Sequence, residues 1–277
     1  MFQYALGRKI ADKYDSELYL DLSWFNENKD STNRIFELDK FNVNFKISTD
    51  DIKKNVYLYR FRALNFISRK LLQKNIQHKN FFIENGLYYN EKIHKVSPHT
   101  YLVGYWQSEK YFSSETEIIV KHFTLRDSGV ISQFDYLGDI KNRNSVSVHI
   151  RRTDFNQYGS IHGTLPLEYY KKAISIVLDS IDNPLFFVFS DDIEWTKTQF
   201  PNVSNFIFID TGKSYLDLFL MSQCKNNIIA NSSFSWWGAW LNQNVDKLVL
   251  APRIWYLNNR ELNEQTYDLI PKKWMKI

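Results

Sequence analysis

The second half of the chain alternates short apolar runs with longer segments that carry apolar residues at helical spacing. The runs of strand length are Ser145–Ile150, Leu185–Phe189, Asn205–Asp210, Asn226–Ala230 and Lys247–Pro252. Helical segments between them include Pro166–Ile181, with Thr164 as a possible cap and Pro166 in the first turn, and Ser214–Cys224. Because helices that connect consecutive strands make right-handed crossovers, five strands and four helices in alternation predict an α/β fold with a parallel sheet.

Polar clusters follow three of these expected strands. They are His149, Arg151, Arg152 and Asp154; then Ser190, Asp191 and Asp192; then Asn231, Ser232, Ser233 and Ser235. The carboxyl ends of parallel strands meet at one edge of a sheet, where ligands of such folds bind. We therefore expect the three clusters to face one crevice.

The chemistry of these clusters suits a phosphorylated ligand. An arginine donates two parallel hydrogen bonds and keeps its charge, which matches a phosphate group. Hydroxyl residues at a helix start leave backbone N–H groups open to an anion. The alternative interpretation is structural: salt bridges between arginine and aspartate tie the sheet end together, and the Asp and Ser residues are ordinary helix caps. Taken together, the clusters predict a diphosphate pocket.

Composition excludes several classes of protein. The net charge of +4 over 277 residues is too small for a nucleic-acid protein unless it is concentrated on one face. Cys224 is the only cysteine, so no internal disulfide can form and a reducing compartment is expected. The sequence has no apolar run of membrane-spanning length, no signal peptide and no metal-binding motif. These features predict a cytoplasmic protein without a bound metal.

The first half of the chain is less regular. Met1–Tyr14 is expected to be helical from its first residues, and Glu17–Leu22 and residues ending at Gly104 are expected strands. The polar stretch Gly138–Asn144 is the expected linker. This gives an N-terminal domain at residues 1–140 and a C-terminal domain at residues 141–277.

A basic segment lies within the first domain. Ile52–Ile83 carries eight Lys or Arg residues, no acidic residue and an apolar helical stripe. One interpretation is a solvated helix that packs on its own domain. The other is a surface for anionic lipid headgroups, which would give peripheral contact with the inner face of a bacterial membrane.

Five stretches of the sequence resemble the bacterial α-1,2-fucosyltransferases of glycosyltransferase family 11. They are MFQYALGRKIA at the start, GYWQSEKYF, HIRRTD, SDDIEW and NSSFSWWGAWL, in the same order and over nearly the whole chain. The resemblance implies a GT-B fold with two Rossmann-like domains. It also implies inverting, metal-independent transfer of L-fucose from GDP-β-L-fucose to the 2-hydroxyl of a terminal galactose. The glycan would be of the surface-polysaccharide or O-antigen type and could be lipid-linked.

The same resemblance implies roles for individual residues. Arg151 would hold the β-phosphate of the donor and neutralise GDP as it leaves, with support from His149 and Arg152. Ser232 and Ser233 would add hydroxyl or backbone donors. Asp217 matches an aspartate that binds GDP in the α-1,6 relatives, where a carboxylate accepts the paired N–H groups of guanine.

Three matters stay open at the level of sequence. Asp154 is the candidate base for the acceptor proton, but it could instead orient an arginine. Chains of the family open with a strand and a GGLGNQ turn before MFQYA, and we expect this turn to be missing here, which bears on activity. The alternatives to fucosyl transfer are another GT-B nucleotide-sugar transferase and a non-catalytic relative that binds GDP or a glycan.

Overall fold

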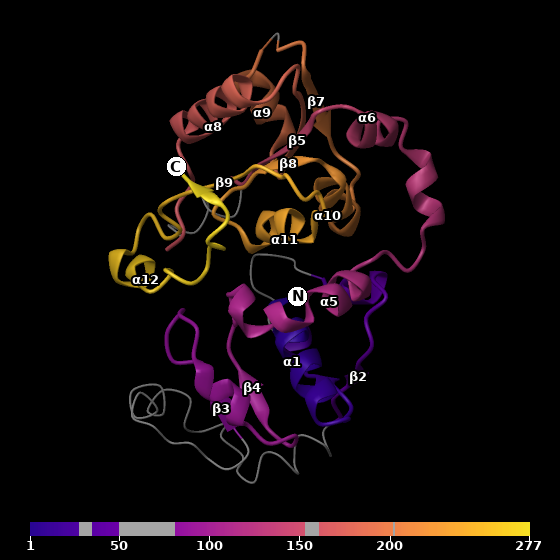
Figure 1. Cartoon of the computed structure of the whole chain (residues 1–277), viewed down its shortest axis with the longest axis vertical. Coiled ribbons are helices and arrows are strands. Elements are labelled where there is room, and N and C mark those ends of the chain that lie inside the picture. Colours follow the sequence, from indigo (N-terminus) through magenta and orange to yellow (C-terminus); the bar gives the residue numbers. More distant parts are fainter. Residues whose placement is uncertain (28–34, 50–80, 153–160, 202) are drawn as a thin grey trace. The chain divides into compact units, whose positions relative to one another are not determined.

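The computed structural model describes residues 1–27, 35–49, 81–152, 161–201 and 203–277. The described chain divides into two compact units, shown in Figure 1. Unit 1 comprises Met1–Leu38 and Val43–His122, and unit 2 comprises Asp39–Asn42 and Phe123–Ile277. The assignment of domains to residues 1–140 and 141–277 stays a prediction.

Unit 1 begins with helix α1 (Phe2–Lys13), which the apolar spacing of the first residues predicts. Its buried face includes Tyr4, Ala5 and Leu6. The remaining elements are α2 (Ser23–Glu27), α5 (Thr116–His122), the short 3-10 helices η1 (Leu38–Lys40, which crosses into unit 2), η2 (Glu91–Lys95), η3 (Glu109–Tyr111) and η4 (Ser113–Glu115), and four strands. Strands β1 (Tyr19–Leu20) and β2 (Lys46–Ile47) form one parallel pair, and β3 (Phe81–Ile83) and β4 (Tyr101–Val103) form another. Most of the basic segment Ile52–Ile83 lies outside the described residues.

Unit 2 is built on one six-stranded sheet in which every neighbouring pair is parallel. The strands are β5 (Ser145–Ile150), β6 (Leu185–Ser190), β7 (Phe206–Ile209), β8 (Asn226–Ile228), β9 (Val249–Ala251) and β10 (Met275–Lys276). Their order in space is β10-β9-β8-β5-β6-β7. Counted from β5, this is the 3-2-1-4-5-6 order of a doubly wound sheet, so the predicted parallel sheet in the C-terminal half is confirmed.

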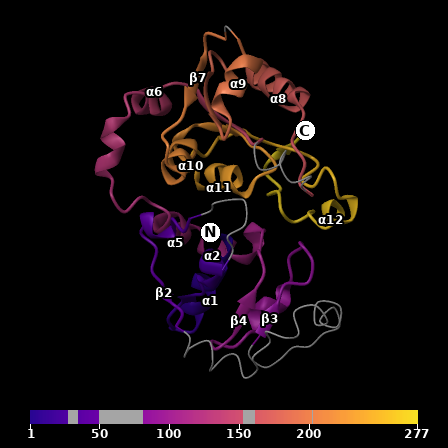
Figure 2. The ribbon, with the colours of Figure 1, turned by 180° about the vertical axis from the view of Figure 1, so that it is seen from behind.

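Helices cover both faces of this sheet, as Figures 1 and 2 show from opposite sides. Helices α8 (Leu167–Ser180) and α9 (Ile193–Gln199) pack on the face that carries Val146, Val148 and Ile150. Helices α6 (Leu137–Asn142), α10 (Ser214–Gln223) and α11 (Ser233–Leu241) belong to the other face, which carries Phe187 and Phe189. Unit 2 is therefore a three-layer α/β unit.

Burial on both faces explains the sequence patterns of the two central strands. The unbroken apolar run of β6 sends Phe186 and Val188 to one core and Phe187 and Phe189 to the other. All six residues of β5 are buried, although its sequence alternates polar and apolar residues. The two serines of β5 are satisfied internally: Ser147 Oγ accepts a hydrogen bond from Asn227 Nδ2 at 2.7 Å, and Ser145 Oγ donates to the Ile140 carbonyl at 2.5 Å. Alternation here does not mark a solvent-facing side of the sheet.

The local structure differs from the sequence patterns at three places. The cap of α8 is Pro166 and not Thr164, and it makes no side-chain cap hydrogen bond. Most of the expected linker Gly138–Asn144 is helical, because Ile140 is buried in the core of unit 2 and anchors α6. The sixth strand, β10, went unpredicted, since its two exposed residues give no apolar run.

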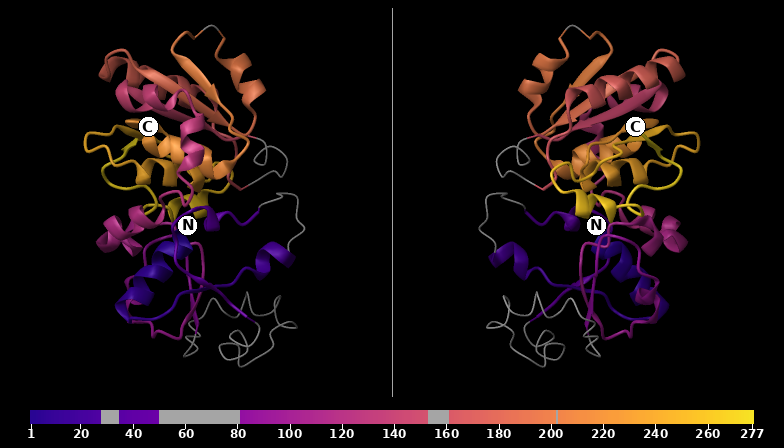
Figure 3. Two further views of the ribbon diagram at one scale, coloured as in Figure 1. Left: turned by 90° about the vertical axis from the view of Figure 1, so that its right-hand side faces the viewer. Right: turned by 90° about the vertical axis from the view of Figure 1, so that its left-hand side faces the viewer.

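The chain ends inside unit 2. Strand β10 pairs with β9, which leaves the carboxyl terminus, marked C in Figure 3, at this end of the sheet. Helix α12 (Arg260–Glu264) lies between these two strands in the sequence. Among the residues described, none of the helices has the length and apolar character needed to cross a membrane.

Candidate active site at the carboxyl edge of the unit 2 sheet

The strand order of unit 2 creates a topological switch point between β5 and β8. The chain leaves β5 toward α8 on one face of the sheet and leaves β8 toward α11 on the other. Connections that diverge in this way open a crevice at the carboxyl ends of the two strands, where doubly wound folds bind ligands. The first and third polar clusters lie at this point.

His149 and Phe234 join these two clusters. His149 lies at the end of β5, and its ring centroid is 5.5 Å from that of Phe234 in the first turn of α11. His149 is almost fully buried, and its ring packs the start of α11 against β5. The sequence predicted the proximity of the clusters but gave no sign of this contact.

The first and second clusters are joined by ion pairs. Arg151 Nε lies 3.3 Å from Asp191 Oδ2, with 26% of the arginine side chain and 15% of the aspartate side chain exposed. Asp191 Oδ1 also accepts a hydrogen bond from the backbone N–H of Arg152 at 2.9 Å. Asp191, at the end of β6, therefore fixes both the side chain and the backbone at the end of β5.

Arg152 is held by two further groups. Its Nε lies 3.3 Å from Asp192 Oδ2, and its guanidinium carbon lies 3.8 Å from the centroid of the Trp195 ring. Asp192 also caps α9 by accepting a hydrogen bond from the Trp195 N–H at 3.2 Å. The structural interpretation is thus correct for Asp192 as a cap and for both ion pairs. Trp195, which the sequence patterns did not single out, stacks against the arginine as guanidinium groups favour.

A buried tyrosine lies beneath Arg151. Tyr170, on α8, has its hydroxyl close to the backbone N–H of Arg151 and is fully enclosed. Burial raises the pKa of Tyr170 far above its usual range, and the nearby backbone N–H of Arg151 lowers it by a smaller amount. The phenol therefore stays neutral, and its buried oxygen has no hydrogen-bond partner among the described residues.

The start of α11 offers two of its three serines to a ligand. Ser232 is the cap and accepts a hydrogen bond from the Phe234 N–H at 3.3 Å, and Ser233 is partly exposed beside it. Ser235 instead points inward: its Oγ accepts from the Ala230 N–H at 3.2 Å and donates to the Ser232 carbonyl at 3.3 Å. Ser235 is buried and both bonds are internal, so its hydroxyl stabilises the start of α11, and its role in donor binding stays a prediction.

Asn231 ties three loops together at this edge. Its Nδ2 donates to the carbonyl oxygens of His162 at 3.2 Å, Gly163 at 3.0 Å and Trp255 at 3.0 Å. Asn231 is buried, and the segments that it joins follow β5 and β9 along the chain. This buried polar residue thus fixes the segment that leads into α11.

Asp217 lies at the same edge but two strands from β5, in the first turn of α10 after β7. Two strand spacings amount to about 10 Å. Thr211 Oγ1 donates to Asp217 Oδ1 at 2.8 Å, and burial raises the pKa of Asp217 to about 6. Half-buried Tyr136 is near enough to Asp217 for the carboxylate to raise the pKa of its phenol, after the larger effect of burial. Asp217 and Tyr136 therefore form a second polar cluster at the carboxyl edge of the sheet, in addition to the arginine pair.

Comparison with known proteins identifies the family. A model described as "Glycosyl transferase family 11" matches residues 22–277. The chain is 36% identical to an O-antigen biosynthesis glycosyltransferase, WbnK, of Escherichia coli, over 94% of this chain and 92% of the relative. The chain belongs to glycosyl transferase family 11.

The chain is also similar to a second curated protein and to a solved structure. An α-1,2-colitosyltransferase of Escherichia coli is 36% identical over 100% of this chain and 94% of its own. Among solved structures, the fucosyltransferase NodZ from Bradyrhizobium matches with a TM-score of 0.46 and 13% identity, covering 86% of each chain.

This family 11 glycosyltransferase therefore carries an arginine pair held by two aspartates, next to a helix start with open N–H groups. Within the described residues, no group of three or more His, Cys, Asp or Glu side chains is arranged to hold a metal ion. The arginines and the α11 terminus place positive charge at this edge of the sheet. Asp154, the candidate base, lies outside the described residues.

Proposed function

We propose that this protein transfers L-fucose from GDP-β-L-fucose, with inversion, to the 2-hydroxyl of a terminal galactose in an O-antigen type glycan. The observation that carries the proposal is the Arg151–Asp191 pair at the switch point of a family 11 chain. The names of the relatives, an α-1,2-colitosyltransferase and an O-antigen glycosyltransferase, support the linkage and the glycan class.

In this proposal Arg151 binds the β-phosphate and stabilises GDP as it leaves. Negative charge accumulates on the diphosphate when the sugar bond breaks, so a cation already in place acts mainly on the transition state. Asp191 orients the guanidinium, because its carboxylate lies 3.3 Å from Nε. Arg152 is fixed by Asp192 and Trp195 and adds a second positive charge beside the first.

The start of α11 supplies the remaining donors. The helix has nine residues, and its first N–H groups face the same edge as the arginines. The helix dipole and open N–H groups favour a phosphate at this point. We therefore propose that Ser232 and Ser233 contact the diphosphate, and that the leaving group is stabilised without a metal ion.

We further propose that Asp217 selects guanine. Its carboxylate can accept the N–H groups of guanine, which adenine lacks, and Tyr136 offers an aromatic neighbour. A nucleotide that reaches from β5 to β7 spans the two strand spacings, about 10 Å, between the arginines and this carboxylate. The raised pKa of Asp217 falls on binding, because the guanine donors favour its charged form.

Several finer features belong to the proposal. The fold is a GT-B arrangement with two Rossmann-like domains, in which unit 1 serves the acceptor. Asp154 acts as the general base for the galactose 2-hydroxyl or orients an arginine. The acceptor can be lipid-linked, with the basic segment Ile52–Ile83 at the inner face of the membrane.

A second candidate is transfer of a different sugar with the same linkage, which the colitosyltransferase relative favours. A non-catalytic relative that binds GDP is a third candidate.

A mass-spectrometric screen separates the three candidates. The chain is incubated with GDP-fucose, GDP-colitose or UDP-galactose and with galactose-terminated or galactose-free oligosaccharides. We expect the mass of one deoxyhexose on the galactosylated acceptor with GDP-fucose. Transfer only from GDP-colitose supports the second candidate, and GDP binding without transfer or donor hydrolysis supports the third.

Calorimetry tests the nucleotide separately. We expect GDP to bind more tightly than ADP or UDP by at least about tenfold, since a charged hydrogen-bonding pair is worth roughly 1.5–3 kcal/mol. Equal affinity for the three nucleotides would contradict the assignment of Asp217.

A further inference from the structure

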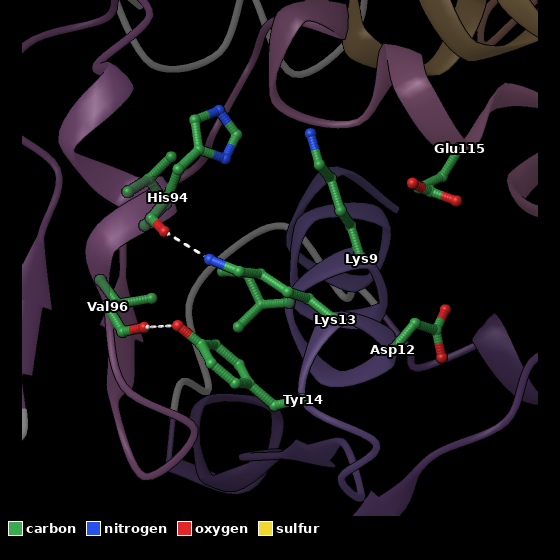
Figure 4. A pocket seen from close by; sticks show the side chains of 9 residues that line it. Lys9, Asp12, Lys13, Tyr14, His94, Val96 and Glu115 are labelled. Atoms are coloured by element: carbon green, nitrogen blue, oxygen red, sulfur yellow. Dashed lines mark hydrogen bonds between the residues drawn. The ribbon is translucent and has the colours of Figure 1, made fainter.

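A pocket of about 380 Å³ lies in unit 1, between the second half of α1 and the short helix η2 (Figure 4). Its size falls within the range of about 300–1,000 Å³ that is usual for small-molecule sites. Apolar side chains form part of its lining, contributed by Ile10, Ile93 and Val96. All of its lining residues belong to unit 1, and none belongs to the strand-end clusters.

Two hydrogen bonds hold the walls of this pocket in place. Lys13 Nζ donates to the His94 carbonyl at 2.8 Å, and Tyr14 Oη donates to the Val96 carbonyl at 2.7 Å. Both bonds are drawn in Figure 4 and connect the end of α1 to residues that are distant in sequence. The hollow is therefore a built feature of unit 1 and not a gap between loose surface side chains.

The charges around the pocket leave a positive excess. Lys9 lies one turn before Lys13, and its ammonium makes no hydrogen bond or ion pair with any part of the chain that the structure describes. Asp12 is already paired with Arg8, whose Nη2 lies 2.6 Å from Asp12 Oδ1. Among the described lining residues, Glu115 is then the one unpaired carboxylate, set against two lysines.

His94 adds a polar group beside Lys9. Its Nε2 lies 2.6 Å from Tyr89 Oη, so the ring is oriented by that bond, and Figure 4 shows the imidazole at the same rim as the Lys9 ammonium. Burial lowers the pKa of His94, and the nearby Lys9 and Lys13 lower it further, against Glu91. Burial likewise lowers the pKa of Lys9, with Lys13 adding to the effect and Glu115 opposing it. An added negative charge would stabilise the charged forms of both side chains.

We propose that this pocket binds an acidic sugar, with its carboxylate on Lys9 and His94 and its ring against the apolar wall. A charged donor and a neutral imidazole suit an oxyanion. The C–H face of a sugar suits an apolar surface, which partly exposed Ile10 provides over buried Ile93 and Val96. Tyr14 closes the lower side with its ring. The site is separate from the diphosphate site, so it does not depend on which sugar the protein transfers.

Three probes that separate the carboxylate from the ring test the proposal by ligand-observed NMR titration of the whole chain. D-Glucuronate carries the carboxylate, D-glucose has the same ring without it, and inorganic phosphate is an anion without the ring. We expect glucuronate to bind at least about tenfold more tightly than either of the others. Comparable binding of glucose or of phosphate would overturn the proposal, as would the absence of saturable glucuronate binding.

Variants locate the site. Lys9→Gln should weaken glucuronate binding by about tenfold, and Glu115→Gln should strengthen it, because the opposing carboxylate is removed. Lys95→Gln is the matched control, since Lys95 is an exposed lysine next to His94 that does not line the pocket. An equal loss in Lys9→Gln and Lys95→Gln, or no gain in Glu115→Gln, would overturn the assignment. GDP affinity should be the same in all three variants, which distinguishes failure of this site from failure of the proposed function.

Discussion

Asp191 Oδ2 lies 3.3 Å from Nε of Arg151, and this contact joins the carboxyl ends of strands β6 and β5. Neither side chain is fully exposed or fully buried, so the pair is oriented by the protein and still open to a ligand. A guanidinium that is held before the ligand arrives needs little reorganisation during the reaction. The predictions about the site start from this pair.

Arg151→Lys should lose most of its transfer rate and keep its melting temperature. Lysine keeps the charge and can still pair with Asp191, but it lacks the planar fork that offers two donors to a phosphate. The loss of one well-placed donor of this kind typically costs about 10²–10³ in rate. Turnover and thermal unfolding are measured on the same preparation, with exposed Arg143→Lys as the control. A lowered melting temperature with normal turnover would mean that Arg151 only ties the sheet together.

Asp191→Asn should lose both stability and activity. The amide can still accept from the Arg152 N–H, but the charge that faces Arg151 is gone. For a partly exposed pair we expect a loss of about 1–3 kcal/mol in the free energy of unfolding. Misplacement of Arg151 should reduce turnover by about 10–100-fold. The same substitution at exposed Asp179 on α8 should change neither quantity, and an unaltered turnover in Asp191→Asn would contradict the orienting role.

Asp217→Asn should stabilise the protein at neutral pH. Burial raises the pKa of Asp217 from its ordinary value of 3.8 to about 6, so the folded state binds this proton more tightly than the unfolded state. Stability therefore falls as the pH rises through this window, and the deficit is fully present above pH 6. Removal of the charge should add about 1–3 kcal/mol at pH 7.5 and little at pH 3.5.

Urea unfolding at the two pH values measures this difference, with exposed Asp246→Asn as the control. The same variant should bind GDP more weakly, because an amide cannot replace the carboxylate toward the guanine donors. Opposite changes in stability and affinity are expected of a residue kept for binding. A variant that is more stable and binds GDP normally would leave Asp217 without the proposed role.

Chelation should leave transfer unaffected. The arginines and the start of α11 supply the positive charge that a divalent ion supplies in other diphosphate sites. Initial rates are compared with EDTA, with Mg²⁺ and with Mn²⁺ after removal of trace metal. A strict requirement for either ion would contradict the view that arginine and a helix terminus stabilise the leaving group.

Much of unit 2 could be predicted from the sequence, because local patterns decide its elements. The buried run that forms β6 and the polar residues after β5, β6 and β8 are identifiable from the order of residues alone, and the parallel direction of strands brings their ends to one edge. Asp191, Asp192, Arg151 and Arg152 do meet there. The order of the strands was not predictable, since hydrophobic periodicity carries no information about which strand lies beside which.

Other details depend on packing that a sequence does not display. The inward turn of Ser235, the stacking of Trp195 on Arg152 and the burial of Ser147 each need a partner from a distant segment. The pocket beside Lys9 also could not be predicted, because its walls come from residues about eighty positions apart. Such contacts appear only when the segments are placed in space.

Gly163→Ala should destabilise the protein more than Gly212→Ala. Both glycines have positive φ, +66° and +65°, so an alanine at either position strains the backbone by roughly 1–2 kcal/mol. Only at Gly163 does a new Cβ meet neighbours, 2.9 Å from Leu257 Cβ and close to Asn258, whereas nothing lies within 4 Å at Gly212. The extra loss in Gly163→Ala therefore measures how closely the loop after β9 approaches the segment that Asn231 holds. Chemical denaturation of the two variants gives this difference directly, and equal losses would mean that the loops can separate without cost.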